Sequence, residues 1–122
     1  MSAIDDRLAD VRKALPPRLR AGEVEAFLAR GGLLVDTRPV GLREQDGPLP
    51  GAVVVDRNQL EWRLDPTSDH RLPEATGPDR EVVLVCDEGY ASSLAAESLQ
   101  RLGLTRVTDL DGGFQAWRAL RA

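Results

Sequence analysis

Four residue types that often carry chemistry are scarce in this chain of 122 residues, which has one cysteine (Cys86), one histidine (His70), one lysine (Lys13) and one tyrosine (Tyr90). A single cysteine cannot form a disulfide within the chain, so nothing requires an oxidising compartment. One cysteine and one histidine cannot supply the three or four protein ligands of a typical zinc site. We therefore expect no metal and no cofactor. The open question is whether the one cysteine is a residue of the packed core or a nucleophile.

Long apolar runs and an excess of positive charge are also absent. The formal net charge is −4, whereas modules that bind nucleic acid carry a basic patch. No apolar run reaches the roughly 20 residues of a membrane-spanning helix, and the first residues lack the apolar core of a signal peptide. We therefore expect a cytoplasmic protein that binds neither nucleic acid nor membranes.

Short apolar runs alternate with helical patterns along the chain. Runs such as residues 82–85 (VVLV) are typical of strands buried on both faces of a parallel sheet. The alternation predicts one α/β domain. Residues 65–81 contain three prolines and predict an exposed loop. Strands are expected at residues 33–35, 52–55, 82–85 and 107–110 with a very short one at 18–20, and helices at residues 22–30, after residue 92 and at 114–120.

An amphipathic helix is predicted at the N-terminus. Its apolar residues recur at helical spacing, at Ile4, Leu8, Val11 and Leu15. The pair Pro16-Pro17 ends this helix. We expect residues 1–17 to form a helical extension and residues 18–122 to form the domain. The helix can pack on its own domain or join a dimer, so a monomer and a dimer both remain open.

The position of Cys86 in the sequence is typical of a nucleophile. It ends the strongest predicted strand, and ligands of parallel sheets bind beyond the carboxyl ends of the strands. The next six residues, Asp87, Glu88, Gly89, Tyr90, Ala91 and Ser92, form a tight turn before a helix. Backbone N–H groups of such a turn and the positive end of the helix favour a thiolate, with Ser92 or Ser93 as a helix cap. The alternative is a small buried residue of the core, since free cysteine is among the most buried types.

Two acids directly follow the thiol. Asp87 and Glu88 oppose a thiolate and repel anionic substrates if their carboxylates face the sulfur. If they face solvent, the effect is screened and small. The sequence leaves both orientations open.

Four segments, in the same order, resemble motifs of the single-domain rhodaneses, a family of sulfurtransferases, over about residues 18–121. Each motif alone is common, but four in the same order are specific. The segments are residues 33–38 (LLVDTR), similar to the family's strand ending in Asp-Val-Arg; 47–52 (GPLPGA), similar to its Gly-His-Ile-Pro-Gly-Ala turn; 85–93 (VCDEGYASS), at its catalytic loop; and 111–117 (DGGFQAW), similar to its Gly-Gly-aromatic-x-Ala-Trp signature.

The resemblance implies a three-layer α/β/α fold with a five-stranded parallel sheet in the order 3-2-4-5-1. It also implies a ping-pong reaction at Cys86. The thiolate takes the outer sulfur of a donor such as thiosulfate or a persulfide, and the resulting cysteine persulfide passes that sulfur to cyanide or a cellular thiol. The donor is a small molecule or is bound to a protein. The loop N–H groups stabilise the anion.

The chain departs from the family pattern in its loop. The family often has a basic residue directly after the cysteine and an arginine five residues after it, where this chain has Asp87 and Ala91. We therefore expect a neutral or protein-bound persulfide to be preferred to thiosulfate. Phosphatases of the same fold use Cys-x5-Arg, whose arginine clamps the oxyanion. The residue six after Cys86 is Ser92, so phosphatase activity is not expected.

Other polar residues have more ordinary interpretations. Asp36 and Arg38 end a strand near the expected site, where a structural pairing of Arg38 with Glu44, or of Asp36 with backbone N–H groups, is favoured over catalysis. Arg57 and Arg63 follow the second strand and are candidates to line the pocket, although solvated arginine is the default. The rival to an enzyme is a weak or inactive rhodanese-like module that binds a protein partner, with the acidic loop and the apolar face of the first helix as contacts.

Overall fold

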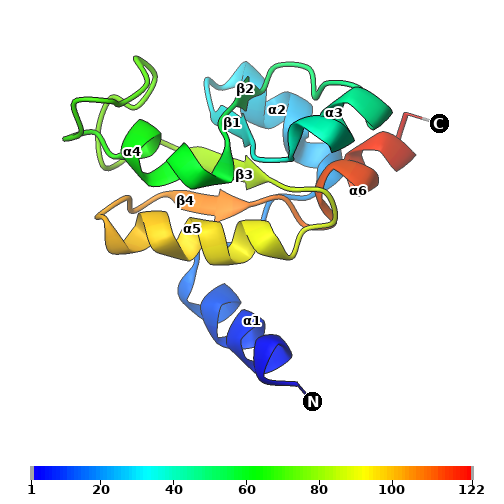
Figure 1. Ribbon diagram of the computed structural model, residues 1–122, viewed down its shortest axis with the longest axis horizontal. Coiled ribbons are helices and arrows are strands. Elements are labelled where there is room, and N and C mark those ends of the chain that lie inside the picture. Colours follow the sequence, from blue (N-terminus) through cyan, green and yellow to red (C-terminus); the bar gives the residue numbers. More distant parts are fainter. Residues whose placement is uncertain (1, 122) are drawn as a thin grey trace.

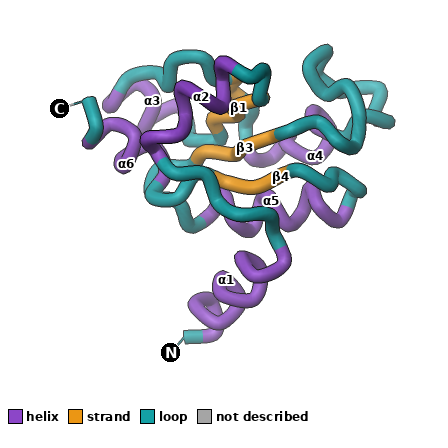
Figure 2. The backbone as a smooth tube through the Cα atoms, turned by 180° about the vertical axis from the view of Figure 1, so that it is seen from behind, coloured by secondary structure: helices purple, strands orange, loops and turns teal. Residues whose placement is uncertain are grey.

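The computed structural model describes residues 2–121. A parallel sheet of four strands in the order β2-β1-β3-β4 forms its centre. β3 pairs with β1 on one side and with β4 on the other, as Figure 2 shows. The carboxyl ends of all four strands therefore meet at one edge. The strands are β1 (Leu33–Asp36), β2 (Val53–Val54), β3 (Val82–Val85) and β4 (Val107–Asp109).

Alternating side chains of the strands supply two separate cores, one on each face of the sheet. Leu84 belongs to the core beneath α4 (Leu60–Leu64) and α5 (Ala91–Arg101), and its neighbour Val85 belongs to the core beneath α2 (Val24–Ala29) and α6 (Gly113–Ala119). Both side chains are fully buried. Successive side chains of a strand point to opposite faces of the sheet, and here they are apolar on both faces. Helices therefore cover both faces, which gives a three-layer α/β/α arrangement (Figure 1).

The expectation of five strands is wrong, because the segment expected at residues 18–20 forms only a single bridge, between Leu19 and Leu110. Leu19 N–H donates to Asp109 O at 3.0 Å, and Asp111 N–H donates to Leu19 O at 2.8 Å. Proline has no N–H to donate, so Pro16 and Pro17 limit any ladder on the N-terminal side. The chain then turns into the short helix η1 (Ala21–Glu23) directly after the bridge.

Two helices were not expected from the sequence. α3 (Val40–Asp46) has no buried residue, so it carries no apolar period that would reveal it. α4 follows the short helix η2 (Arg57–Gln59), and it buries Leu60 and Leu64 one helical turn apart. Two apolar residues at helical spacing favour a helix, but two positions are too few to distinguish a helix from a loop.

The N-terminal helix α1 (Ala3–Ala14) lies against α5 (Figure 1). The Ser2 side chain caps it by accepting from Asp5 N–H at 3.2 Å. Leu8 and Val11 are buried, whereas Ile4 at the first turn is 51% exposed. The helix thus packs on its own domain along its C-terminal half.

The segment between α4 and β3 is a loop, as expected, but it is not exposed throughout. Leu72 and Ala75 are buried in the core beneath α4 and α5. Within the described residues 2–121, no helix is both long enough and apolar enough to cross a membrane.

Candidate active site

The thiol of Cys86 lies directly after β3, at the carboxyl edge of the sheet. The residue is 8% exposed, and two backbone N–H groups point at its sulfur. Gly89 N–H donates to Sγ at 3.2 Å, and Ser92 N–H donates at 3.3 Å. The turn, called the thiol loop (residues 86–92) below, is thus a backbone nest of the kind that holds an anion.

The thiol loop is shorter than expected before its helix begins. α5 starts at Ala91, so Ala91 and Ser92 belong to the helix. The expected cap is also wrong, because Tyr90 occupies the cap position without a side-chain hydrogen bond. The hydroxyls of Ser92 and Ser93 are engaged elsewhere, since both donate to Asp109 Oδ2, at 2.8 and 2.7 Å.

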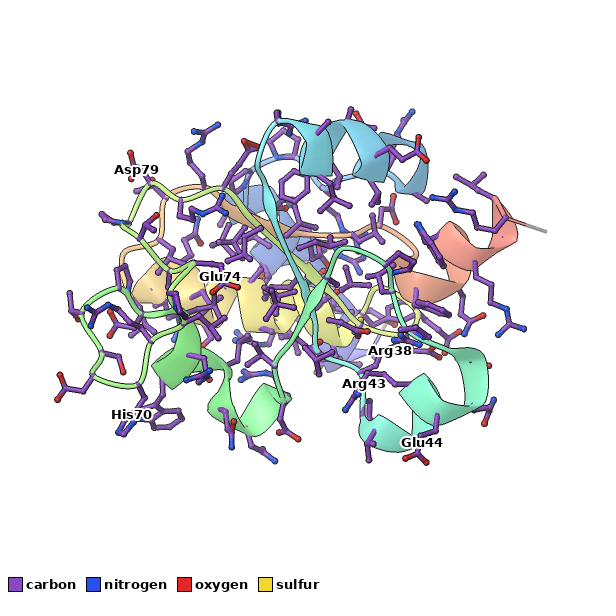
Figure 3. All side chains as sticks on the ribbon, turned by 90° about the horizontal axis from the view of Figure 1, so that it is seen from above. Arg38, Arg43, Glu44, His70, Glu74 and Asp79 are labelled. Atoms are coloured by element: carbon purple, nitrogen blue, oxygen red, sulfur yellow. The ribbon has the colours of Figure 1, made fainter. Side chains whose placement is uncertain are left out.

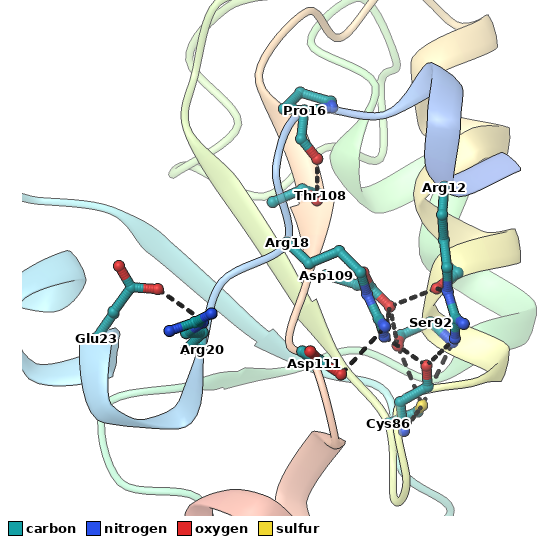
Figure 4. A network of polar contacts seen from close by, with 12 residues as sticks. Arg12, Pro16, Arg18, Arg20, Glu23, Cys86, Ser92, Thr108, Asp109 and Asp111 are labelled. Carbon is teal, nitrogen blue, oxygen red and sulfur yellow. Dashed lines mark hydrogen bonds and ion pairs between the residues drawn. The ribbon is translucent and has the colours of Figure 1, made fainter. Parts of the chain in front are cut away.

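A buried polar network lies behind the thiol loop, and we call it the Asp109 network (Arg12, Arg18, Ser92, Ser93 and Asp109; Figure 4). The thiol of Cys86 donates to Ser92 Oγ at 3.1 Å, and the Ser92 hydroxyl donates onward to the fully buried carboxylate of Asp109. The sulfur therefore stands at one end of a hydrogen-bonded chain that ends on a carboxylate.

Two arginines complete the Asp109 network. Arg18 donates to Asp109 from Nε at 2.9 Å and from Nη2 at 3.1 Å, and Arg12 Nε donates to Ser93 Oγ at 3.0 Å. Both arginines also donate to the carbonyl of Gly89. Burial by itself lowers the pKa of the Arg18 guanidinium, but the hydrogen bond and charge of Asp109, with the charges of Asp111 and Cys86, raise it overall.

The outer side of the thiol loop is fastened by α6. Phe114 N–H donates to Cys86 O at 2.9 Å, and Gln115 N–H donates to Asp87 O at 3.0 Å. This approach requires glycine at position 113, where φ is +59° and an added Cβ would lie 2.6 Å from Cys86 O. The glycine at the first position of α6 therefore lets the helix approach the loop that bears the thiol.

The acids next to the thiol differ in their surroundings. The Asp87 carboxylate accepts a hydrogen bond from Gln115 Nε2 at 2.9 Å, which ties it to α6. Glu88 is exposed. Both residues still line the cavity at the thiol, and no basic residue of the loop balances them.

A cavity of about 360 Å³ opens at Cys86. Arg57 reaches it, although its guanidinium is paired with Glu61 at 2.9 Å. Arg63 lines a separate cavity of about 600 Å³ together with His70, whose carbonyl accepts from Arg63 Nη1 at 2.7 Å. Figure 3 shows His70 on the opposite side of this view from Arg38. The smaller cavity is lined by Thr37, Arg38, Pro39, Arg57, Cys86, Asp87, Glu88, Tyr90 and Ala91.

Asp36 and Arg38 form a buried ion pair with each other. Arg38 Nη2 lies 2.8 Å from Asp36 Oδ2, and Arg38 N–H donates to Asp36 Oδ1 at 3.0 Å. The guanidinium carbon stacks 3.6 Å from the centre of the Phe114 ring. The partner of Arg38 is thus Asp36 instead of Glu44, and the pair braces the wall of the cavity.

Sequence reasoning missed four residues of the Asp109 network: Arg12, Arg18, Ser93 as a partner of the carboxylate, and Asp109. One signal was available, because Asp109 is a charge inside a run expected to be a strand buried on both faces. The arginines gave no such signal. Among residues 2–121, no group of three or more His, Cys, Asp or Glu side chains is placed to hold a metal ion.

Comparisons with known proteins agree with this geometry. The profile of the rhodanese-like domain matches residues 20–120. The thiosulfate sulfurtransferase GlpE of Pseudomonas savastanoi pv. phaseolicola is 31% identical over 107 residues, which cover 88% of each chain.

Solved structures show the same fold. A protein of unknown function from Rhodopseudomonas palustris, described as a possible tyrosine phosphatase, is 30% identical with a TM-score of 0.85, covering 100% of this chain and 93% of that one. The human single-domain sulfurtransferase TSTD1 is 22% identical with a TM-score of 0.68, covering 85% of this chain and 96% of its own. The second likeness bears on the fold alone.

Proposed function

The chain belongs to the rhodanese-like domain family and is a sulfurtransferase of the rhodanese type, and we propose that it carries a sulfane sulfur as a persulfide on Cys86. The observation that supports this most directly is the nest of the thiol loop, whose N–H groups from Gly89 and Ser92 are aimed at Sγ. Such donors favour a thiolate and then the persulfide anion.

In the first half-reaction the Cys86 thiolate attacks the outer sulfur of the donor. A bond forms between Sγ and that sulfur, and the S–S bond of the donor breaks with its electron pair leaving on the donor's inner sulfur. A persulfide donor leaves as a thiolate, and thiosulfate leaves as sulfite. The two N–H groups on Sγ supply hydrogen bonds to the anionic sulfur.

In the second half-reaction a thiolate acceptor attacks the outer sulfur of the Cys86 persulfide. The acceptor becomes a persulfide, and Cys86 leaves as the thiolate that began the cycle. One S–S bond is broken and one is formed in each half, so no external oxidant or reductant is needed. Splitting the transfer in two is ordinary covalent catalysis.

The charges of the cavity favour a neutral or protein-bound persulfide donor over thiosulfate. Asp87 and Glu88 line the cavity, and Arg57, its partly exposed cation, is paired with Glu61. Arg38, the other cation of the lining, is paired with Asp36. A dianionic donor therefore meets two cations whose charges are already balanced, together with the carboxylates of Asp87 and Glu88.

The substitution Ala91→Arg tests this donor preference, because Ala91 is exposed at the cavity and occupies the position where the family often has arginine. An exposed cation contributes about 1 kcal/mol, so the KM for thiosulfate is expected to fall about fivefold. Ala91→Gln is the control for size. Equal KM values in the two variants, or a low thiosulfate KM with high turnover in the unmodified protein, would contradict the assignment.

The function itself is tested by the mass of the intact protein after incubation with glutathione persulfide or thiosulfate. Cys86 is the only cysteine, so a gain of one sulfur reports on this residue. We expect the gain in the natural sequence and its loss to a thiol acceptor, with no gain in Cys86→Ser. No gain with either donor would refute the proposal and favour a partner-binding module. Hydrolysis of p-nitrophenyl phosphate is expected to stay at background.

A further inference from the structure

Two arginines from outside the matched domain donate hydrogen bonds to the backbone of the thiol loop, on the side of the Asp109 network. Arg12 lies on α1 and Arg18 lies between α1 and η1, whereas the rhodanese-like match begins at residue 20. Arg12 Nη2 donates to Gly89 O at 2.8 Å, and Arg18 Nη2 donates to the same oxygen at 2.6 Å. Figure 4 shows the side chains of Arg12 and Arg18 reaching toward Cys86 from two neighbouring segments of the chain.

These contacts hold the peptide unit directly after the Gly89 N–H group. Gly89 donates its N–H to the sulfur while its carbonyl, on the next peptide plane, accepts from both arginines. Hydrogen bonds from a charged donor are about twice as strong as neutral ones. Because each peptide unit is planar, these two bonds fix the orientation of the Gly89–Tyr90 unit, with its carbonyl turned away from the sulfur. The loop is thereby kept in the form that binds an anion.

The same contacts bring positive charge close to the sulfur. The buried part of the network holds the guanidinium groups of Arg12 and Arg18 against a single buried carboxylate, Asp109. Asp111 also pairs with Arg18, but its side chain is 61% exposed and its charge is screened. The network therefore carries an excess of positive charge beside a loop whose own residues are acidic.

The position of Arg12 depends on how α1 is docked. Leu8 and Val11 are buried, and Gln100 Nε2 on α5 donates to Ala14 O at 2.8 Å. α5 begins at the end of the thiol loop, so α1 and the loop share one support. The Arg12 guanidinium also lies 5.9 Å from the centre of the Tyr90 ring at the loop tip.

We propose that Arg12 and Arg18 are positioning residues for sulfur transfer, which makes the N-terminal segment part of the active site. They supply, from behind the loop, the positive charge that residues 87 and 91 lack, and they keep the Gly89 carbonyl turned away from the sulfur. This inference rests on the proposed role of Cys86 as the carrier of the persulfide.

The test compares Arg12→Gln with Lys13→Gln, which removes the same charge from the next residue of α1, on its exposed side. Arg12 is preferred to Arg18 because its removal leaves the ion pair between Arg18 and Asp109 intact. Two quantities are measured: the rate of alkylation of Cys86 by iodoacetamide as a function of pH, which follows the thiolate, and the single-turnover rate of sulfur gain from glutathione persulfide. Thermal melts check that each variant is folded.

We expect Arg12→Gln to alkylate about fivefold more slowly at pH 7 with its profile moved to higher pH, since one partly buried positive charge near a thiolate is lost. Sulfur gain should slow by a similar factor, and Lys13→Gln should stay within about twofold of the natural sequence, as is usual for exposed charges. Arg12→Lys should restore the pH profile in part, because it returns the charge without the fork that contacts both Gly89 and Ser93.

Identical profiles for Arg12→Gln and Lys13→Gln would overturn the inference, whatever their melting temperatures. A purely structural role would lower the melting temperature of Arg12→Gln and leave its alkylation profile in place, which also overturns it. If no protein gains sulfur from any donor, the proposed function fails, yet the alkylation profiles still decide whether the arginines act on the thiol.

Discussion

Replacing Asp109 with asparagine removes the negative charge at the centre of the Asp109 network while keeping the shape of the side chain. Oδ2 accepts from Ser92, Ser93 and Arg18 Nη2, at 2.8, 2.7 and 3.1 Å. An amide nitrogen placed there would face another donor, the Arg18 guanidinium. The alternative rotamer turns the amide nitrogen toward Arg18 Nε, which is also a donor. Either way the buried ion pair is lost.

Breaking a buried pair by removing one partner costs about 3–5 kcal/mol. We take the lower end, about 3 kcal/mol, because the Arg18 side chain is 18% exposed and keeps its contacts with Gly89 and Asp111. With an unfolding entropy of about 2.1 cal/mol/K per residue over 122 residues, that loss corresponds to a fall in Tm of about 12 °C.

Differential scanning calorimetry at pH 7 measures this fall directly. Asp111→Asn is the matched control, because it removes a carboxylate from the same arginine at a side chain that is 61% exposed. It should lower Tm by no more than about 2–4 °C, the value of an exposed pair of up to about 1 kcal/mol. A Tm for Asp109→Asn within about 4 °C of the control, which corresponds to about 1 kcal/mol, would refute the reasoning that the buried ion pair of Asp109 with Arg18 stabilises the fold.

Three further predictions concern the core, the thiol loop and pH. Leu84→Ala, at a fully buried position of the central strand, should lower the free energy of unfolding in urea by about 2–5 kcal/mol; a loss below about 1 kcal/mol would contradict the assignment of the core. Gly89→Ala should abolish sulfur gain by Cys86, because the added Cβ would lie 2.7 Å from a backbone nitrogen. Gly103 also has a positive φ, but a Cβ added there would meet no atom within 4 Å, so Gly103→Ala should keep the activity. The hydrogen bond from Arg30 holds the pKa of Glu81 below its usual value of 4.5, so Glu81 stabilises the fold above that pH and loses this contribution as pH falls through its folded pKa. The free energy of unfolding should therefore fall less between pH 7 and pH 3 in Glu81→Gln than in the natural sequence. An equal fall in both proteins would contradict the direction of this pKa shift.

The parts of the fold that follow from local pattern were predictable from the sequence. Apolar runs such as residues 82–85 placed the central strands, and the helical spacing of Leu8 and Val11 placed α1. The expectation of a fifth strand was wrong, because pairing around Leu19 stops at a single bridge, and the two prolines before it cannot donate to a longer ladder. α3 was missed because it lies on the surface with no buried residue, and hydrophobic periodicity is the primary signal that a single sequence offers for a helix.

The candidate site also has a part that local sequence predicts and a part that it does not. The cysteine at a strand end and the glycine in the turn after it were enough to predict N–H groups aimed at the sulfur. Asp109 could have been singled out as a charge in a buried strand, but its partners could not, since Arg12 lies 81 residues before Ser93 and nothing local marks the two as neighbours. The acids looked equivalent in sequence, yet Gln115 binds Asp87 and leaves Glu88 exposed.

The fastening of the thiol loop by α6 has a consequence for biosynthesis. A ribosome releases the N-terminal part of a chain first, so α1 and the strands emerge before the residues that bond to Cys86 O and Asp87 O. Those residues are Phe114 and Gln115, and Gln115 lies 28 residues after Asp87. The thiol loop is therefore expected to be fastened only after α6 has been synthesised, so that a nascent chain ending before α6 carries Cys86 without these two hydrogen bonds.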